Sequence, residues 1–154
     1  MHLPHLAPYN KQPLLFVTTC TAGRRPILAG RIAQDILEAV WMKSAIIDGW
    51  FVGHYLLMPD HVHLFAVPSL EAKPLAVWMK SWKSISSRRL TASGAFIPPI
   101  WQNDYFDHFV RNPDAYRQKW EYVQQNPVRQ GLCQQSTAWP FQGMLHDLPP
   151  RLLG

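Results

Sequence analysis

The sequence predicts an α+β fold, a ferredoxin-like sandwich in which helices cover one face of a central antiparallel sheet. Segments of strand and helix character follow one another in the order strand, helix, strand, strand, helix, strand, helix. Apolar residues make up 47% of the chain and charged residues 16%, which is typical of a globular protein. At 154 residues, the chain is long enough for one domain with a single core.

The first half of the chain contains three predicted strands and one predicted helix. Residues 14–21, LLFVTTCT, are rich in the β-branched and aromatic side chains that favour strands. Residues 31–44 place apolar side chains at helical spacing and polar ones on the opposite side. Residues 49–58 form the second strand and, after a Pro-Asp turn, residues 61–68 form the third. In the ferredoxin-like order, the first and third strands lie in the middle of the sheet.

The second half contains two more helices and a strand. Residues 74–90 show an apolar helical stripe, and residues 100–110 form the fourth strand. The last helix covers residues 115–126, with Asp114 as its N-terminal cap. Pro127 ends this helix, because the residue before a proline disfavours the helical conformation.

The chain is expected to form one domain over residues 1–133, followed by a loosely structured extension over residues 134–154. The extension is rich in proline, tryptophan and glutamine and has no periodicity. Its apolar runs, like those elsewhere, are far shorter than the roughly 20 residues of a membrane span, and the N-terminus lacks a secretory pattern. Cys20 and Cys133 do not make a disulfide framework. We therefore expect a soluble cytoplasmic protein with no membrane partner.

The charge of the chain favours an anionic partner. The formal net charge is +5, which points first to nucleic acid. Seven tryptophans offer two interpretations, since they can stack on bases or simply pack in the core.

Two histidines one residue apart form the first candidate site. Strand alternation places His61 and His63 on one face, roughly 6.5 to 7 Å apart along the strand. Two imidazoles at that spacing can converge on one metal ion, since each metal–nitrogen bond is about 2 Å long. The alternative is that His63 is a hydrogen-bonded core residue and His61 a turn residue.

A second candidate lies in the last predicted helix. Tyr122 and Asn126 are four residues apart and therefore share a helix face. A phenol that can act as a nucleophile would lie beside an amide oxygen that can bind a metal. The alternative is that Tyr122 is a rim residue and Asn126 a helix cap.

The two sites together resemble a known family. The segments LLFVTTCTAGRRPIL, HYLLMPDHVHLFAVP and WQNDYFDHFVRNPDAYRQKWEYVQQNPVRQGL are similar to those of the single-tyrosine HUH transposases, and within them to the REP-associated tyrosine transposases of bacteria. The similarity extends over most of the chain. One departure is Asp60, which stands where relatives often have asparagine.

The resemblance implies specific roles. His61 and His63 would be the histidines of the HUH motif, with Asn126 as a third ligand of Mg²⁺ or Mn²⁺. Tyr122 would be the nucleophile, cutting and rejoining single-stranded DNA near palindromic hairpins through a 5′-phosphotyrosine. Such proteins act on the nucleoid in the bacterial cytoplasm, and both monomers and homodimers occur.

Several further residues are predicted to contact DNA or to support the site. The helix at 74–90 carries four cations that would bind phosphates, or would form an ordinary solvated face: Lys80, Lys83, Arg88 and Arg89. Arg24 and Arg25 are candidates for contacts with a single strand. From the resemblance, Asp107 and Arg111 would support the active site without acting in catalysis.

Two other functions compete with the transposase interpretation. A non-catalytic nucleic-acid-binding module of the same fold would explain the charge and the tryptophans. A metal-dependent phosphodiesterase that uses water would leave Tyr122 with a structural role only.

Overall fold

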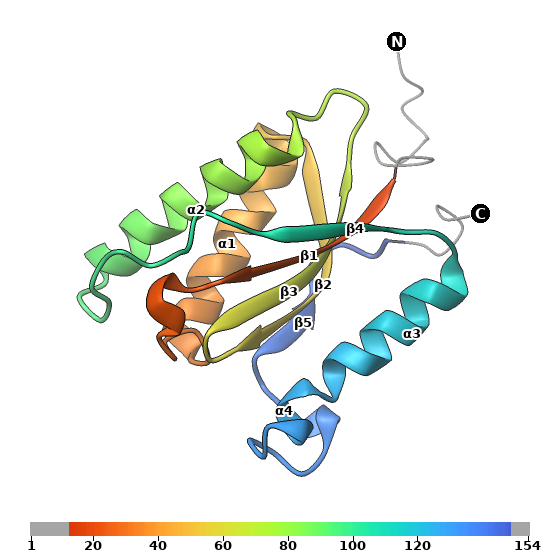
Figure 1. The fold of residues 1–154 in the computed structure, drawn as a ribbon. Helices are drawn as coiled ribbons and strands as arrows, with labels where there is room; N and C mark the ends of the chain where they lie inside the picture. The colour runs from red at the N-terminus through yellow and green to blue at the C-terminus, as the bar shows by residue number, and fades with distance from the viewer. Residues whose placement is uncertain (1–12, 149–154) are drawn as a thin grey trace.

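The computed structural model describes residues 13–148. Its strands and helices follow the predicted order (Figure 1). The elements are β1 (Leu14–Cys20), α1 (Arg31–Ile47), β2 (Trp50–Met58), β3 (His61–Pro68), α2 (Leu75–Ala92), β4 (Phe106–Val110), α3 (Pro113–Gln124), α4 (Asn126–Arg129) and β5 (Gln142–Met144), with 3₁₀ turns at η1 (Ala22–Arg24) and η2 (Ser136–Ala138). None of the helices in this part of the chain is long and apolar enough to cross a membrane.

The strands form one antiparallel sheet in the order β4-β1-β3-β2-β5. β1 and β3 are central, as the ferredoxin-like order requires, and β2 and β4 flank them. The predicted α+β class and ferredoxin-like arrangement are therefore confirmed. β3, the strand with the two histidines, is hydrogen-bonded on both sides.

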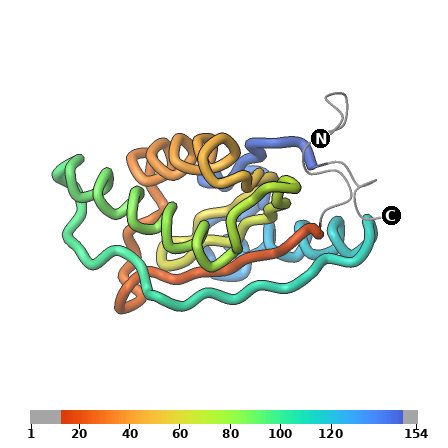
Figure 2. The backbone as a smooth tube through the Cα atoms, turned by 90° about the horizontal axis from the view of Figure 1, so that it is seen from above, coloured from red at the N-terminus to blue at the C-terminus, as the bar shows by residue number. Residues whose placement is uncertain are grey.

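The helices α1 and α2 cover one face of the sheet. Tryptophans fill much of the space between them and the strands: Trp41, Trp78 and Trp82 are fully buried there. Trp50 and Trp78 stack with ring centroids 4.9 Å apart. Core packing is therefore the role of these tryptophans, and they offer no stacking surface to bases. Figure 2 shows the two helices on one side, with the segment leading into β4 running beside β1.

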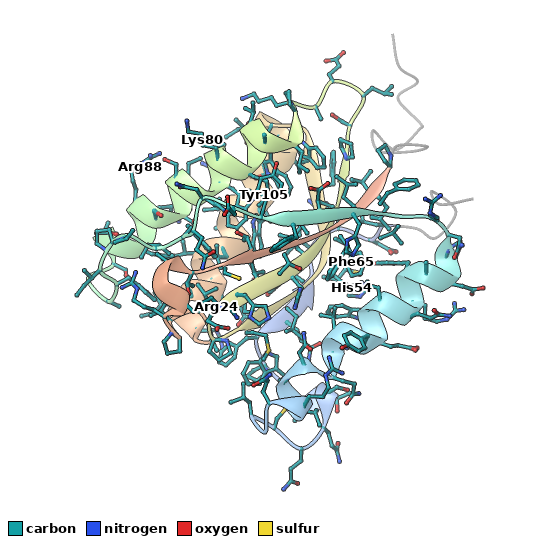
Figure 3. All side chains as sticks on the ribbon, viewed as in Figure 1. Arg24, His54, Phe65, Lys80, Arg88 and Tyr105 are labelled. Atoms are coloured by element: carbon teal, nitrogen blue, oxygen red, sulfur yellow. The ribbon has the colours of Figure 1, made fainter. Side chains whose placement is uncertain are left out.

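The third helix, α3, lies against the opposite face, in addition to the two helices of the sandwich. The Tyr116 hydroxyl lies 2.7 Å from His54 Nδ1, and the Trp120 ring stacks on His54 with centroids 4.5 Å apart. Burial raises the pKa of Tyr116 to about 12 and lowers that of His54, so both groups are neutral at pH 7. Figure 3 shows His54 and Phe65 between the sheet and α3.

Two predicted boundaries differ from the structure. α3 begins at Pro113, and Asn112, instead of Asp114, is its cap: Asn112 Oδ1 accepts from the Ala115 N–H at 2.8 Å. The fourth strand covers only 106–110 of the predicted 100–110. The preceding residues follow another path, with Trp101 making a single bridge to Thr21.

Residues 134–148 are more ordered than the expected loose extension. The Trp139 indole is buried and donates to the Leu57 carbonyl at 2.9 Å. β5 pairs with β2, and Leu148 packs so closely on Gly53 that a Cβ there would lie 2.6 Å from the Leu148 Cδ1. This segment therefore extends the sheet at its β2 edge. The remaining residues of the predicted extension, 149–154, and residues 1–12 lie outside the described part.

Candidate metal and nucleophile site

β3 places both histidines on the face that α3 covers. Phe65 lies in the core under α3, whereas Val62 and Leu64 lie in the core under α1 and α2. The alternation of β3 therefore directs His61 and His63 to the α3 side. Their ring centroids are 4.8 Å apart and their planes are nearly perpendicular, at 84°.

His63 is held by contacts on both ring nitrogens. Thr18 Oγ1 lies 2.8 Å from Nδ1, and Asn126 Nδ2 lies 3.1 Å from Nε2. Phe16 stacks on the ring with centroids 5.3 Å apart. Burial, aided by the nearby charges of His61, Lys119 and Arg129, lowers the pKa of His63 to about 3. A neutral imidazole keeps a lone pair for a metal ion, and an Nδ1–H donated to Thr18 would direct that lone pair to Nε2.

His61 is oriented by a carboxylate. Its Nδ1 lies 2.8 Å from Asp60 Oδ1, and Asp60 Oδ2 accepts from Arg24 Nε at 3.0 Å. Although burial opposes it, these two contacts hold the pKa of Asp60 below its ordinary value. A carboxylate behind an imidazole fixes the ring and its tautomer, as at many metal sites. Asp60, the departure from the family pattern, is therefore built into the site.

The tyrosine and the asparagine belong to two helical segments instead of one. α3 ends at Gln124, and Asn126 begins α4. The Asn126 side chain reaches His63, whereas Tyr122 remains 63% exposed. Of the predicted pair, Asn126 is thus brought to the histidines, and Tyr122 precedes it on a separate helix.

Arg129 connects Tyr122 and Asn126. Its guanidinium lies 4.0 Å from the Tyr122 ring centroid and donates to the Tyr122 carbonyl at 2.9 Å. It also donates to Asn126 Oδ1. Because a guanidinium only donates, the amide oxygen faces Arg129 and the amide nitrogen faces His63. The spacing of Asn126 and Arg129, three residues apart, is the sequence signal that could have identified this arginine.

These residues fit a divalent cation with a small protein ligand set. In residues 13–148, no three His, Cys, Asp or Glu side chains gather in a way that could hold a metal. The donors are therefore two imidazoles, one backed by Asp60 and one neutral, together with the Asn126 amide. For its oxygen to bind the metal, that amide would have to turn away from Arg129. A ligand set this small leaves coordination positions for oxygens of a substrate.

The predicted cations of α2 divide into two kinds. Lys80, Arg88 and Arg89 are exposed, and Figure 3 shows Lys80 and Arg88 pointing away from the sheet. Lys83 is only 7% exposed, and its ammonium donates to the Gln102 and Asp104 carbonyls at 2.8 and 3.0 Å. Burial lowers the pKa of Lys83 to about 8. The structure therefore gives Lys83 a role in holding the segment before β4.

The two arginines after β1 also differ. Arg24 pairs with Asp60 and is connected through it to His61. Arg25 donates to the backbone carbonyls of Ala22 and Pro99. Arg24 alone of these two is thus joined to the histidine site by the contacts described here.

Asp107 and Arg111 do not lie beside the histidines. Asp107 is opposite Val17, whose side chain is in the core under α1 and α2, so it points to the other face. Arg111 is an exposed residue directly after β4. The neighbouring His108 does face the site, with its ring centroid 5.6 Å from that of Phe16.

The family model described as "Transposase IS200 like" matches residues 14–126, a segment that includes β1, the histidine pair, Tyr122 and Asn126. The chain belongs to this family of transposases. It is similar to the REP-associated tyrosine transposase of Escherichia coli (strain K12), with 26% identity over 91% of this chain and 81% of that protein. It is also similar to an uncharacterized protein of Haemophilus influenzae, with 22% identity over 78% of this chain and 83% of that protein.

A solved structure supports the fold of this transposase. The structure of a REP-associated tyrosine transposase bound to a REP hairpin superposes with a TM-score of 0.68 and 19% identity, covering 97% of this chain and 96% of that one. This likeness of fold covers more of the chain than the residues 14–126 that the family model matches.

Proposed function

We propose that this transposase is a metal-dependent endonuclease and strand transferase for single-stranded DNA, acting near palindromic hairpins. The observation that carries the proposal is that the start of α4 meets β3. Asn126 Nδ2 lies 3.1 Å from His63 Nε2 there, and Tyr122 comes one turn before Asn126 in the chain. A non-catalytic binding module would not require this combination of imidazoles, amide and accessible phenol.

His61, His63 and the turned Asn126 amide would hold Mg²⁺ or Mn²⁺. When bound, the metal would neutralise charge on the oxygens of the scissile phosphodiester. Asp60 orients the first imidazole and Thr18 the second. Both rings are thus positioned before the metal arrives, which reduces the ordering required on binding.

Tyr122 would perform the covalent step. Its phenolic oxygen, after giving its proton to solvent, attacks the phosphorus and forms the new P–O bond. The bond from phosphorus to the 3′ oxygen breaks, and that oxygen takes up a proton to become a 3′-hydroxyl. The DNA remains on the enzyme as a 5′-phosphotyrosine. Attack of another 3′-hydroxyl on this linkage reverses the step and joins the strands without ATP.

We infer the class of substrate from a similar protein of known structure and from the exposed cations of α2. A hairpin is bound by the related transposase of known structure, and we extend that substrate class to this chain. Lys80, Arg88 and Arg89 are exposed and would contact phosphates.

Since α3 packs on the sheet of its own chain through Tyr116, one copy would carry a complete site and act in cis. We place this activity in the bacterial cytoplasm, on the nucleoid.

The test is capture of the covalent intermediate. A single-stranded hairpin substrate labelled on the 3′ side of the cleavage site should become attached to the protein, whereas a 5′-side label should leave on a fragment with a 3′-hydroxyl. Tyr122→Phe should bind the DNA but form no adduct. Tyr105→Phe is the matched control, since it removes a phenol from a partly exposed ring.

Two results would contradict the assignment. An adduct that persists in Tyr122→Phe would show that another residue is the nucleophile. Cleavage without any adduct in the wild type would favour the phosphodiesterase that uses water.

A further inference from the structure

A row of side chains crosses the sheet from the histidine site to the outer strand. Thr18 of β1 lies opposite both His63 of β3 and Phe106 of β4. Directly opposite residues in antiparallel strands point to the same face. Since Thr18 Oγ1 contacts His63 on that face, Phe106 points there as well. Two strand spacings, about 10 Å, separate the backbones of Phe106 and His63.

The Phe106 side chain is largely in solvent. It is 71% exposed and belongs to neither hydrophobic cluster formed by residues 13–148. The helix on this face, α3, packs on the sheet through Tyr116 and Val123. Single exposed aromatic residues are common. The significance of Phe106 comes from its position in line with the catalytic site.

The next row on the same face of the sheet, in which Phe16 lies opposite His108, is aromatic and basic. Phe16 stacks on His63, and the His108 ring centroid lies 5.6 Å from that of Phe16. From α3, Lys119 Nζ lies 5.2 Å from the Phe16 ring centroid. Aromatic faces for bases next to cations for phosphates are the elements of single-strand binding sites.

We propose that Phe106 is a stacking site for a base of single-stranded DNA adjacent to the phosphate that Tyr122 attacks. This inference rests on the proposed function and specifies how its substrate is held. A base is the occupant favoured by Lys119, which lies over the Phe16 ring in the next row, because each base in a strand is accompanied by a phosphate. A ring that offers no hydrogen bond would accept any base, so the site would position the strand without selecting its sequence.

The same strand supplies a matched control. Phe109 is also exposed, at 53%, and also lies on β4. It is opposite Leu15, which packs with the core under α1 and α2, so it points away from the histidines. The two phenylalanines are therefore both exposed residues of one strand, and they differ in the face of the sheet that they occupy.

The experiment compares two probes of equal charge. One is a fluorescent thymidine homopolymer of about 15 nucleotides, and the other is the same backbone without bases. Binding is measured by anisotropy in EDTA, so that no cleavage occurs. Phe106→Ala should weaken binding of the thymidine probe about 5- to 150-fold and leave binding of the abasic probe unchanged. Phe106→Trp should restore affinity, and Phe109→Ala should leave it within about twofold of the wild type.

Each other result would overturn the inference. Equal losses on both probes, or equal losses in the Phe106 and Phe109 variants, would exclude base stacking at Phe106. A Phe106→Ala variant that binds DNA normally but loses self-association in sedimentation would make this face a contact between two copies. A wild type that binds neither probe would overturn the proposed function as well. A wild type that binds and forms the tyrosine adduct, with Phe106→Ala unaffected, would overturn the stacking site alone.

Discussion

The docking of α3 depends on a hydrogen bond that one substitution removes. Tyr116→Phe deletes the hydroxyl that lies 2.7 Å from His54 Nδ1, in a side chain that is 9% exposed. The ring and its contact with Phe65 remain. His54 is half-buried, so water can pair with its ring, and the loss of this hydrogen bond should cost about 0.5–1.5 kcal/mol. For a domain of this size, each kcal/mol lowers the melting temperature by roughly 2–4 °C.

The assay should report on α3 as well as on the whole protein. Urea unfolding followed by circular dichroism gives the free energy of unfolding, and hydrogen exchange gives the opening of α3. We expect faster exchange in α3 and slower formation of the Tyr122 adduct, because Tyr122 is carried by this helix. Tyr105→Phe is the control, and its effect should stay within about 0.5 kcal/mol.

A small effect would refute this account of docking. If Tyr116→Phe changes the free energy of unfolding by less than about 0.5 kcal/mol and α3 exchange is unchanged, the hydrogen bond does not hold the helix. The stacking of Trp120 on His54 and the packing of Val123 would then carry the docking. Trp120→Leu should in that case release α3 where Tyr116→Phe does not.

Other predictions concern the metal, the DNA and pH. His61→Ala should weaken Mn²⁺ binding in a titration and abolish cleavage while the protein stays folded, and full cleavage in excess EDTA would contradict a metal role. Lys80→Gln, Arg88→Gln and Arg89→Gln should each weaken the salt dependence of hairpin binding. The slope of log binding constant against log salt concentration should fall by about one for each variant. Burial lowers the pKa of His54, against the opposing charge of Asp147. The unfolded chain therefore binds more protons below about pH 6.5, so stability should fall as the pH drops through that range, and less so in His54→Phe.

The alternation of apolar and polar residues in the strands predicted the shared face of the two histidines, but not the residues that lie beside them. Alternation alone placed His61 and His63 on one face, and the structure has them there. Which residues lie beside them depends on the register between strands, which a single sequence does not reveal. Only that register places Thr18 beside His63 and Phe106 beside Thr18. Alternation within a single strand therefore could not predict that Phe106 lies in the same cross-strand row as His63.

Lys83 shows that charge can obscure a helical pattern. The buried face of α2 includes Met79, Trp82 and Ser86. Lys83 lies four residues after Met79 and three before Ser86, so its spacing assigns it to this face. Its charge suggested solvent or DNA instead. Two backbone carbonyls that accept from its ammonium make the burial possible.

The C-terminal segment escaped prediction for a different reason. β5 has three residues, too few to show alternation. Its order comes from contacts with distant residues: Trp139 donates to Leu57, and Leu148 packs on Gly53. Tertiary contacts of this kind leave no local pattern in the sequence.

One proline accounts for the different positions of the two helical site residues. Pro127 has no N–H and its ring would crowd the carbonyl four residues earlier, so α3 cannot continue through it. It is accepted in the first turn of α4, which begins at Asn126. Tyr122 stays exposed at the end of α3, and its carbonyl accepts from the Gln125 N–H at 3.2 Å and from the Arg129 guanidinium at 2.9 Å. Asn126, beyond the break, reaches His63. The accessible phenol and the inward amide are therefore consequences of the same interruption of the helix.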